Sequence, residues 1–377
     1  MGNDRRERVQ VEAARLVDEG VRSNVFPGGA VCVAYRDDDR WETIEVARGE
    51  LAPRLGPVRT DTPYDLASLT KPFVATAALR LRAAGRLDLD ETLGDTLPET
   101  RGAPAAGASI EALATHRAGL AAWGALYLDL PDPPGSAGAQ RWMVVHAARR
   151  VEARPSEQAV YSDLGYLLLG RMLEVRAGTS LAALVSSEVL GPLGVADAIV
   201  YPAALPDDAA ARLAERAPPT ERCGWRGRLL RGEVHDDNCA AFGGVAGHAG
   251  LFGTARSVAA LGQATLDALD AGSRQGPAAA AEAFLPSELT AWALAERPGG
   301  SLRFGWDGKS APSSAGTRTS PDSFGHLGYT GTSIWCDPAR GLVVVLLTNR
   351  VFPTRANVKI RGFRPAFHDG ILAAFDA

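Results

Sequence analysis

The chain has 377 residues, of which 46% are hydrophobic and 22% are charged, and its formal net charge is −4. This composition is ordinary for a soluble globular protein with a substantial core. A slightly acidic chain lacks the broad basic surface that binds nucleic acid or anionic lipid. We therefore expect neither a nucleic acid nor a membrane as partner.

The chain starts with a charged stretch, residues 1–8, that lacks the apolar segment of a secretory signal peptide. No apolar run approaches the length that spans a bilayer. The four cysteines are scattered and form no Cys-x-x-Cys pair, which is typical of reduced thiols. On these grounds the sequence predicts a cytoplasmic protein, and it does not indicate an oligomeric state.

The predicted elements begin with an amphipathic helix over residues 5–22. Two strands follow, at 30–35 and 41–47, and they form a hairpin. An apolar, Ala-rich run predicts a helix from Ser68 to about Ala84, and Pro72 suits its first turn because the missing N–H costs nothing there.

The middle of the chain is mainly helical, and the end returns to strands. Further helices are predicted at about 109–116, 140–151, 162–177, 179–190 and 255–270. Residues 201–250 are rich in turns, and residues 271–282 are predicted to form a surface loop. A second hairpin joins 332–336 to 342–347, and a helix at 355–376 ends the chain.

Strands therefore cluster at both ends of the chain. The economical arrangement is an α+β fold in which one antiparallel sheet combines the N- and C-terminal strands, is flanked by helices and receives an inserted, mainly helical region. We expect a single catalytic domain over 1–377. Its α/β part would comprise about 1–65 and 285–377, and its helical part about 66–284.

The stretch Ser68-Leu69-Thr70-Lys71 is the first candidate for chemistry. Lys71 would lie one turn after Ser68 on the same helix face, so the hydroxyl has a base and the positive end of the helix dipole nearby. Of the 40 Lys and Arg residues only three are lysines, and an arginine cannot act as a base. We expect burial and nearby dipoles to lower the pKa of Lys71. A solvated helix face is the alternative interpretation.

Two other stretches are each ambiguous alone. Tyr161 precedes a predicted helix, and the stretch Tyr161-Ser162-Asp163 is also what an ordinary N-cap formed by Ser162 or Asp163 would give. Residues 325–332, which contain His326, can be read as a strand edge loosened by glycines.

Taken together, Ser68-x-x-Lys71, Tyr161-x-Asp163 and His326-x-Gly328 resemble the three ordered motifs of the penicillin-recognising serine hydrolases. That superfamily includes class C β-lactamases, the DD-peptidases among the penicillin-binding proteins, and related family VIII-like esterases. The resemblance runs from about residue 20 to the C-terminus. It implies a β-lactamase/transpeptidase-like fold and a serine hydrolase that cleaves a small ester or amide through a Ser68 acyl-enzyme.

The resemblance also implies roles for individual residues. Ser68 would be the nucleophile, with Lys71 or Tyr161 as the first base, and the backbone N–H groups of Ser68 and Tyr329 would form the oxyanion hole. His326 would orient Tyr161 or contact the substrate. Residues expected to support the site or contact substrate are Asp163, His326, Gly328, Thr330, Trp123 and Arg355.

Two departures from the family motifs bear on the substrate. Asp163 stands where the family usually has Asn, and His326-Leu327 stands where Lys-Thr commonly holds a substrate carboxylate. A histidine is mostly neutral near pH 7 and leucine donates no hydrogen bond. The sequence therefore predicts an esterase-like enzyme, with Arg355 as a partial substitute cation. The alternatives are β-lactamase or D-alanyl-D-alanine carboxypeptidase activity, or a non-catalytic binding protein that retains the fold.

We expect no metal and no cofactor. The spacing of His235, Asp236, Asp237 and His248 matches no standard metal site, and these side chains are expected to satisfy one another. Other residues are assigned to the core or to the substrate pocket. Cys32 and Cys336, on predicted strands, are assigned to the core, whereas Trp123 and Tyr127 are assigned either to an apolar substrate pocket or to the core.

Overall fold

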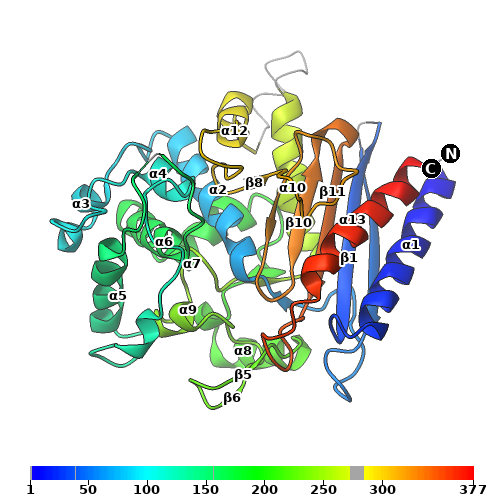
Figure 1. Cartoon of the computed structure of the whole chain (residues 1–377), viewed down its shortest axis with the longest axis horizontal. Helices are drawn as coiled ribbons and strands as arrows, with labels where there is room; N and C mark the ends of the chain where they lie inside the picture. The colour runs from blue at the N-terminus through cyan, green and yellow to red at the C-terminus, as the bar shows by residue number, and fades with distance from the viewer. Residues whose placement is uncertain (1, 39, 156, 272–283) are drawn as a thin grey trace.

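The computed structural model describes residues 2–38, 40–155, 157–271 and 284–377. One antiparallel sheet of six strands combines both ends of the chain, as predicted (Figure 1). The strands, in their order across the sheet, are β2 (Arg40–Gly49), β1 (Gly28–Asp37), β11 (Leu342–Thr348), β10 (Ser333–Asp337), β9 (Phe324–Leu327) and β8 (Asp307–Gly308).

The strand β1, which lies between β2 and β11, is apolar on both faces. Val31 and Val33 belong to a buried cluster with α1 (Gly2–Arg22) and α13 (Ile360–Asp376), whereas Cys32 and Ala34 belong to the larger cluster on the other side of the sheet. Side chains alternate between the faces of a strand, so a strand covered on both sides reads as a continuous apolar run.

Helices cover both faces of the sheet. In Figure 1, α1 and α13 lie side by side on the outer face, and both chain ends lie near each other there. On the other face, α10 (Ala255–Ala271) contacts β1, β10 and β11, and α12 (Ser287–Leu294) packs on α10. The large helical region extends away from this inner face.

The remaining elements make up that region and its connections. Its longer helices are α2 (Thr70–Ala83), α5 (Ala137–Arg149), α6 (Asp163–Ala177) and α8 (Asp207–Arg216). Its shorter helices and turns are η1 (Ala67–Leu69), α3 (Leu93–Thr96), η2 (Pro98–Thr100), α4 (Ile110–Ala114), η3 (Leu126–Leu128), α7 (Leu181–Val185), η4 (Ser186–Leu190), η5 (Pro202–Ala204) and α9 (Asp237–Ala241). Small strands pair in two groups: β3 (Tyr64–Asp65), β7 (Phe252–Gly253) and β4 (Ile199–Val200), and β5 (Arg222–Cys223) with β6 (Arg228–Leu229); η6 (Pro338–Arg340) joins β10 to β11.

The structure differs from the predicted elements at a few places. The helices α8 and α12 were not predicted, and the last helix begins at Ile360 rather than at 355. The expected helical part, 66–284, contains α10, which packs on the sheet. The surface loop predicted at 271–282 lies outside the described residues except for Ala271, which ends α10.

Cys32 and Cys336 lie in the core, as predicted, and all four cysteines are buried and free of disulfides. Among the described residues, none of the helices combines the length and the apolar character needed to cross a bilayer.

Two helix glycines give a matched test of packing. A Cβ built at Gly262 in α10 would lie 2.8 Å from Val343 and 2.9 Å from the Cys336 sulfur, whereas nothing lies within 4 Å of a Cβ at Gly362 in α13. Gly262→Ala should destabilise by about 1–3 kcal/mol because it overpacks the contact with the sheet. Gly362→Ala should stabilise by about 0.5–1 kcal/mol because alanine restricts the unfolded chain.

Melting temperatures of the two variants would check this prediction, with the wild type as reference. Equal shifts in the two variants would contradict the packing of α10 described above.

Candidate active site

The site begins at the turn that carries Ser68. The buried carboxylate of Asp65 accepts hydrogen bonds from the backbone N–H of Ala67 (2.8 Å) and of His235 (2.7 Å). Ala67 has a left-handed φ of +47°, and the short turn η1 leads directly into α2. Ser68 therefore lies one turn before the α-helix and does not cap it, and its side chain stays partly exposed.

Lys71 is fully buried beneath this turn, and its ammonium group has three acceptors. Its Nζ lies 2.8 Å from Ser68 Oγ, 2.6 Å from Asp163 Oδ1 and 3.2 Å from the carbonyl oxygen of His248. An ammonium has three N–H donors, so each donor has one partner. The predicted Ser68–Lys71 contact is therefore present, and Asp163 joins it.

The expected direction of the Lys71 pKa is wrong. Burial acts to lower the pKa of Lys71, but the Asp163 carboxylate outweighs burial, and the pKa is raised above its ordinary value. The departure from the family motif at position 163 is the physical reason, because an asparagine there would bring no negative charge.

Tyr161 and Asp163 are placed by the start of α6. Ser162 caps this helix: its Oγ accepts a hydrogen bond from Gly165 N–H (3.0 Å) and donates one to the Ala121 carbonyl (2.6 Å). The cap considered in the sequence analysis is thus present at Ser162, and the same turn places Asp163 against Lys71. The Lys71 ammonium lies 4.8 Å from the centre of the Tyr161 ring. Burial raises the pKa of Tyr161, and the positive charge of Lys71 partly offsets this.

His326 lies on β9 and faces the same site, 5.9 Å from Tyr161 between ring centroids. It is buried, and this burial together with the Lys71 charge lowers the pKa of His326 to about 3. Its Nδ1 lies 2.9 Å from the Leu327 carbonyl. A carbonyl only accepts, so Nδ1 carries the proton, and the neutral ring offers Nε2 as an acceptor.

The turn after β9 is bound to the turn that carries Ser68. Thr330 donates its hydroxyl to the Asp65 carbonyl (2.7 Å), and Thr332 donates to the Leu66 carbonyl (3.1 Å). Gly328 is required by this approach, because a Cβ there would lie 1.9 Å from Thr332 Oγ1 and 2.6 Å from the Leu66 carbonyl oxygen. Thr330 and Gly328 therefore support the site.

The two turns bring together the backbone groups expected to form an oxyanion hole. Within the described part of the chain, neither Ser68 N–H nor Tyr329 N–H donates a hydrogen bond to the protein. Unpaired backbone donors beside a reactive hydroxyl are available to a developing negative charge on a substrate.

Two arginines that the sequence analysis missed hold the turn at 328–332. Arg364, on α13, donates to the carbonyls of Gly328 (2.7 Å) and Thr332 (2.8 Å). Arg350 donates to the Tyr329 carbonyl (2.8 Å), and its guanidinium lies 4.4 Å from the centre of the Tyr329 ring. Both arginines follow the last strand of the sheet, and nothing in their local sequence indicates their partners.

A charged network flanks the same turn. Glu221 accepts from Arg355 Nε (2.7 Å) and lies 2.8 Å from His235 Nε2, and Asp237 binds Arg355 (3.3 Å) and Arg226 (2.9 Å). The His235 ring stacks on Tyr329 at 5.8 Å. Arg355 is therefore paired with two carboxylates, which opposes its expected use as a substitute cation for a substrate carboxylate.

The four polar loop residues expected to satisfy one another do so only in part: His248 pairs with Asp236, whereas His235 and Asp237 pair with residues outside this set. His248 Nε2 lies 2.9 Å from Asp236 Oδ1, which also caps α9 by accepting Cys239 N–H (2.7 Å). In the part of the chain that the structure describes, no group of three or more His, Cys, Asp or Glu side chains is arranged to hold a metal ion.

Two exposed aromatic side chains adjoin the site. Trp123, 47% exposed, directly follows Ala122, whose carbonyl accepts a hydrogen bond from Asp163 N–H (2.9 Å). Tyr329 is 51% exposed. Tyr127 is half-buried and packs on Trp225 at 4.8 Å between ring centroids. Trp123 and Tyr329 are thus exposed aromatic side chains that lie on chain segments far apart in sequence.

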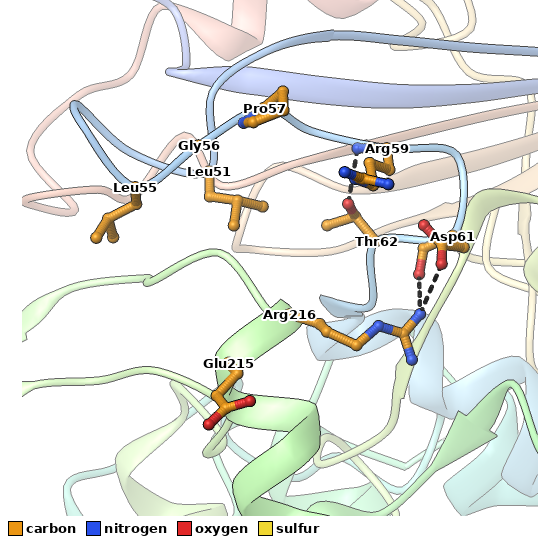
Figure 2. Close-up of a pocket in the computed structure, with 9 residues that line it drawn as sticks. All are labelled: Leu51, Leu55, Gly56, Pro57, Arg59, Asp61, Thr62, Glu215 and Arg216. Atoms are coloured by element: carbon orange, nitrogen blue, oxygen red, sulfur yellow. Dashed lines mark hydrogen bonds and ion pairs between the residues drawn. The ribbon is translucent and has the colours of Figure 1, made fainter.

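A separate cavity of 340 Å³ lies between the loop that follows β2 and the end of α8 (Figure 2). Its lining includes Arg216, which binds Asp61, and Leu51 and Leu55. None of the residues singled out above as site candidates lines it.

The model of the Beta-lactamase family matches residues 13–364, nearly the whole chain. The chain belongs to the beta-lactamase family. It is a serine hydrolase, as the sequence predicted.

The relatives differ in the activities for which they are named. Esterase EstB of Burkholderia gladioli is 30% identical, over 90% of this chain and 91% of its own length. N-acetylmuramyl-L-alanine amidase of Bacillus subtilis (strain 168) is 29% identical, over 89% of this chain and 80% of its own. The structure of EstCE1, a hydrolase with promiscuous acyltransferase activity, superposes with a TM-score of 0.71, covering 96% of this chain and 99% of that one at 21% identity.

The ionisation of Lys71 can be read directly because the chain has only three lysines. With selectively ¹³C-labelled lysine, the Cε resonance of Lys71 should titrate above the ordinary lysine range. In Asp163→Asn the titration should move down, below the ordinary value, because burial then acts without the opposing carboxylate. Lys309→Arg and Lys359→Arg would assign the resonances. An unchanged Lys71 titration in Asp163→Asn would contradict the role given to Asp163.

Proposed function

We propose that this chain is an esterase that hydrolyses small, uncharged esters through an acyl-enzyme on Ser68. The observation that carries the proposal is the contact of Ser68 Oγ with Lys71 Nζ at 2.8 Å, beside two backbone N–H groups without protein acceptors. A hydroxyl, a base and an oxyanion site are the minimum set for nucleophilic acyl transfer.

The partners of Lys71 determine where its lone pair points. The Asp163 carboxylate and the His248 carbonyl can only accept hydrogen bonds, whereas the Ser68 hydroxyl can also donate. When Lys71 loses one proton, the two remaining protons stay with the two acceptors. The lone pair then faces Ser68 Oγ, so neutral Lys71 is a pre-oriented base. Because the pKa of Lys71 is raised, activity should increase toward alkaline pH.

Tyr161 is the residue that passes the proton from Lys71 to the leaving group. As Ser68 Oγ forms its bond to the substrate carbonyl carbon, its proton passes to Lys71, and the carbonyl oxygen becomes an oxyanion facing Ser68 N–H and Tyr329 N–H. The bond to the leaving alkoxide then breaks. Tyr161 is a protonated phenol whose ring centre lies 4.8 Å from Lys71 Nζ, and it donates a proton to the alkoxide and recovers one from Lys71. Water reverses these transfers to release the acid.

The preference for uncharged substrates follows from the charges around Ser68. Lys71 is paired with Asp163, Arg355 with Glu221 and Asp237, and His326 is neutral. Among the described residues around Ser68, the cations named above are all paired with carboxylates or bound to backbone carbonyls. A substrate carboxylate would therefore be desolvated without a free cation, which is costly. Exposed Trp123 and Tyr329 offer apolar contacts instead.

Substitution of the proposed nucleophile and base should abolish turnover without unfolding the protein. Ser68→Ala removes the acylated oxygen, and Lys71→Arg replaces the base with a guanidinium that keeps its proton. Each variant should lose at least about 10³-fold in kcat/KM for p-nitrophenyl butyrate. Lys309→Arg is the matched control and should keep wild-type activity, since Lys309 binds loop carbonyls.

A fluorophosphonate gives a second measurement on the same variants. The wild type and Lys309→Arg should gain one mass adduct on Ser68, and Ser68→Ala should gain none. Labelling of another residue, or near wild-type turnover by Ser68→Ala, would remove Ser68 from the mechanism.

The enzyme should also prefer esters to β-lactams and D-Ala-D-Ala peptides. Leu327 and neutral His326 deny a substrate carboxylate one charge-assisted hydrogen bond, worth about 1.5–3 kcal/mol or one to two decades of rate. We expect kcat/KM for p-nitrophenyl butyrate to exceed that for nitrocefin. In His326→Lys/Leu327→Thr the ratio should shift toward nitrocefin, with Leu327→Val as a control that adds no hydroxyl. A wild-type kcat/KM for nitrocefin equal to or above that for p-nitrophenyl butyrate would contradict the proposed specificity.

A further inference from the structure

We propose that His116 is the positioning residue that fixes the Tyr161 phenol over Ser68 and Lys71. The inference rests on the proposed function, since it gives His116 importance only through Tyr161. Its basis is that His116 binds the peptide groups on both sides of Tyr161 and also packs on the ring between them.

The backbone contacts enclose Tyr161 on both sides. The Val160 N–H donates to the His116 carbonyl at 2.9 Å, and the Ser162 N–H donates to His116 Nδ1 at 2.9 Å. One residue thus restrains the backbone immediately before and after the tyrosine. Ser162 also caps α6, so the same contact joins His116 to the start of that helix.

The ring contacts restrain the Tyr161 side chain. The His116 ring lies between Tyr161 and Tyr166, with centroids 4.6 Å and 5.0 Å away. Tyr166 is itself fixed, because its hydroxyl donates to the Ala114 carbonyl at 2.8 Å. Since Nδ1 accepts a hydrogen bond, the ring is neutral and its proton is on Nε2. Burial, with the charge of Lys71, holds the pKa of His116 well below its usual range, so this tautomer persists.

His116 is held rigidly and in an uncommon conformation. It follows α4 with φ of +59°, a left-handed value that is uncommon for residues other than Gly, although His, Asn and Asp adopt it more often than most. The next residue, Arg117, donates to the carbonyls of Thr115 (2.7 Å) and Leu302 (2.8 Å), among others, and fixes the turn. A glycine would be the easier residue here if only the backbone mattered. A glycine, however, could make neither the Nδ1 contact with Ser162 nor the ring contact with Tyr161.

The test separates positioning from general stability by a double-mutant cycle. His116→Gly removes the ring and the acceptor without backbone strain, and His116→Asn keeps an acceptor in the place of Nδ1 and tolerates the left-handed φ. Each is made in the wild type and in Tyr161→Phe. Activity on p-nitrophenyl butyrate and melting temperature are measured for all of them, and His116→Phe replaces the glycine variant if that one fails to fold.

We expect His116→Gly to lower kcat by about 10–100-fold with KM within about threefold, because a misplaced proton donor affects the transition state more than substrate binding. His116→Asn should recover most of that loss. In Tyr161→Phe, which alone should lower kcat, the further effect of His116→Gly should be less than about threefold, since groups that act together are not additive.

The outcomes separate the role of His116 from the role of Tyr161. Equal losses from His116→Gly in both backgrounds, or unchanged kcat in the wild-type background, would overturn the role of His116 and leave the role of Tyr161 intact. Wild-type kcat in Tyr161→Phe would instead overturn the role of Tyr161 in the proposed function, and the inference with it.

Discussion

The ion pair between Lys71 and Asp163 is the constraint on which the rest of the site depends. An ammonium with no solvent exposure is unstable unless a charge and hydrogen bonds compensate for its lost hydration, and Asp163 supplies both at 2.6 Å. The pair joins the start of α2 to the start of α6, so it also fixes Ser68 relative to Tyr161. The same carboxylate keeps Lys71 protonated, so the stability of the site and the availability of its base oppose each other.

The fold also holds the two turns on either side of this ion pair in fixed positions. Thr330 and Thr332 bind the turn after β9 to the turn that carries Ser68. Arg364, on α13, donates to the Gly328 carbonyl and so also holds the turn after β9. The backbone N–H groups proposed as oxyanion donors, of Ser68 and Tyr329, thus come from two segments about 260 residues apart in sequence, joined by hydrogen bonds between side chain and backbone. Such preorganisation means that little rearrangement is needed as charge develops in the transition state.

Much of the fold and part of the candidate site could be predicted from the sequence, and there is a physical reason why the rest could not. The terminal strands and the Ser68–Lys71 contact are local patterns, with residues two or three positions apart, and the rarity of lysine marked Lys71. Asp163 was recognised as a departure, but the direction of the Lys71 pKa was wrong because the distance between the two side chains depends on how α2 and α6 pack. His116, Arg350 and Arg364 were missed for the same reason: their partners lie 20 or more residues away.

The distribution of charge connects the architecture to the choice of substrate. The site uses cations to hold its own parts in place: Lys71 binds Asp163, Arg355 binds Glu221, and Arg350 and Arg364 bind backbone carbonyls. Two buried histidines, His116 and His326, are neutral because of burial and partly because of the Lys71 charge. A site whose positive charges are all engaged in structure can stabilise an oxyanion through backbone donors but has little to offer a carboxylate. The replacement of Lys-Thr by His326-Leu327 is therefore consistent with this distribution of charge, and the proposed preference for an uncharged ester rests on the same electrostatics that hold Ser68 in place.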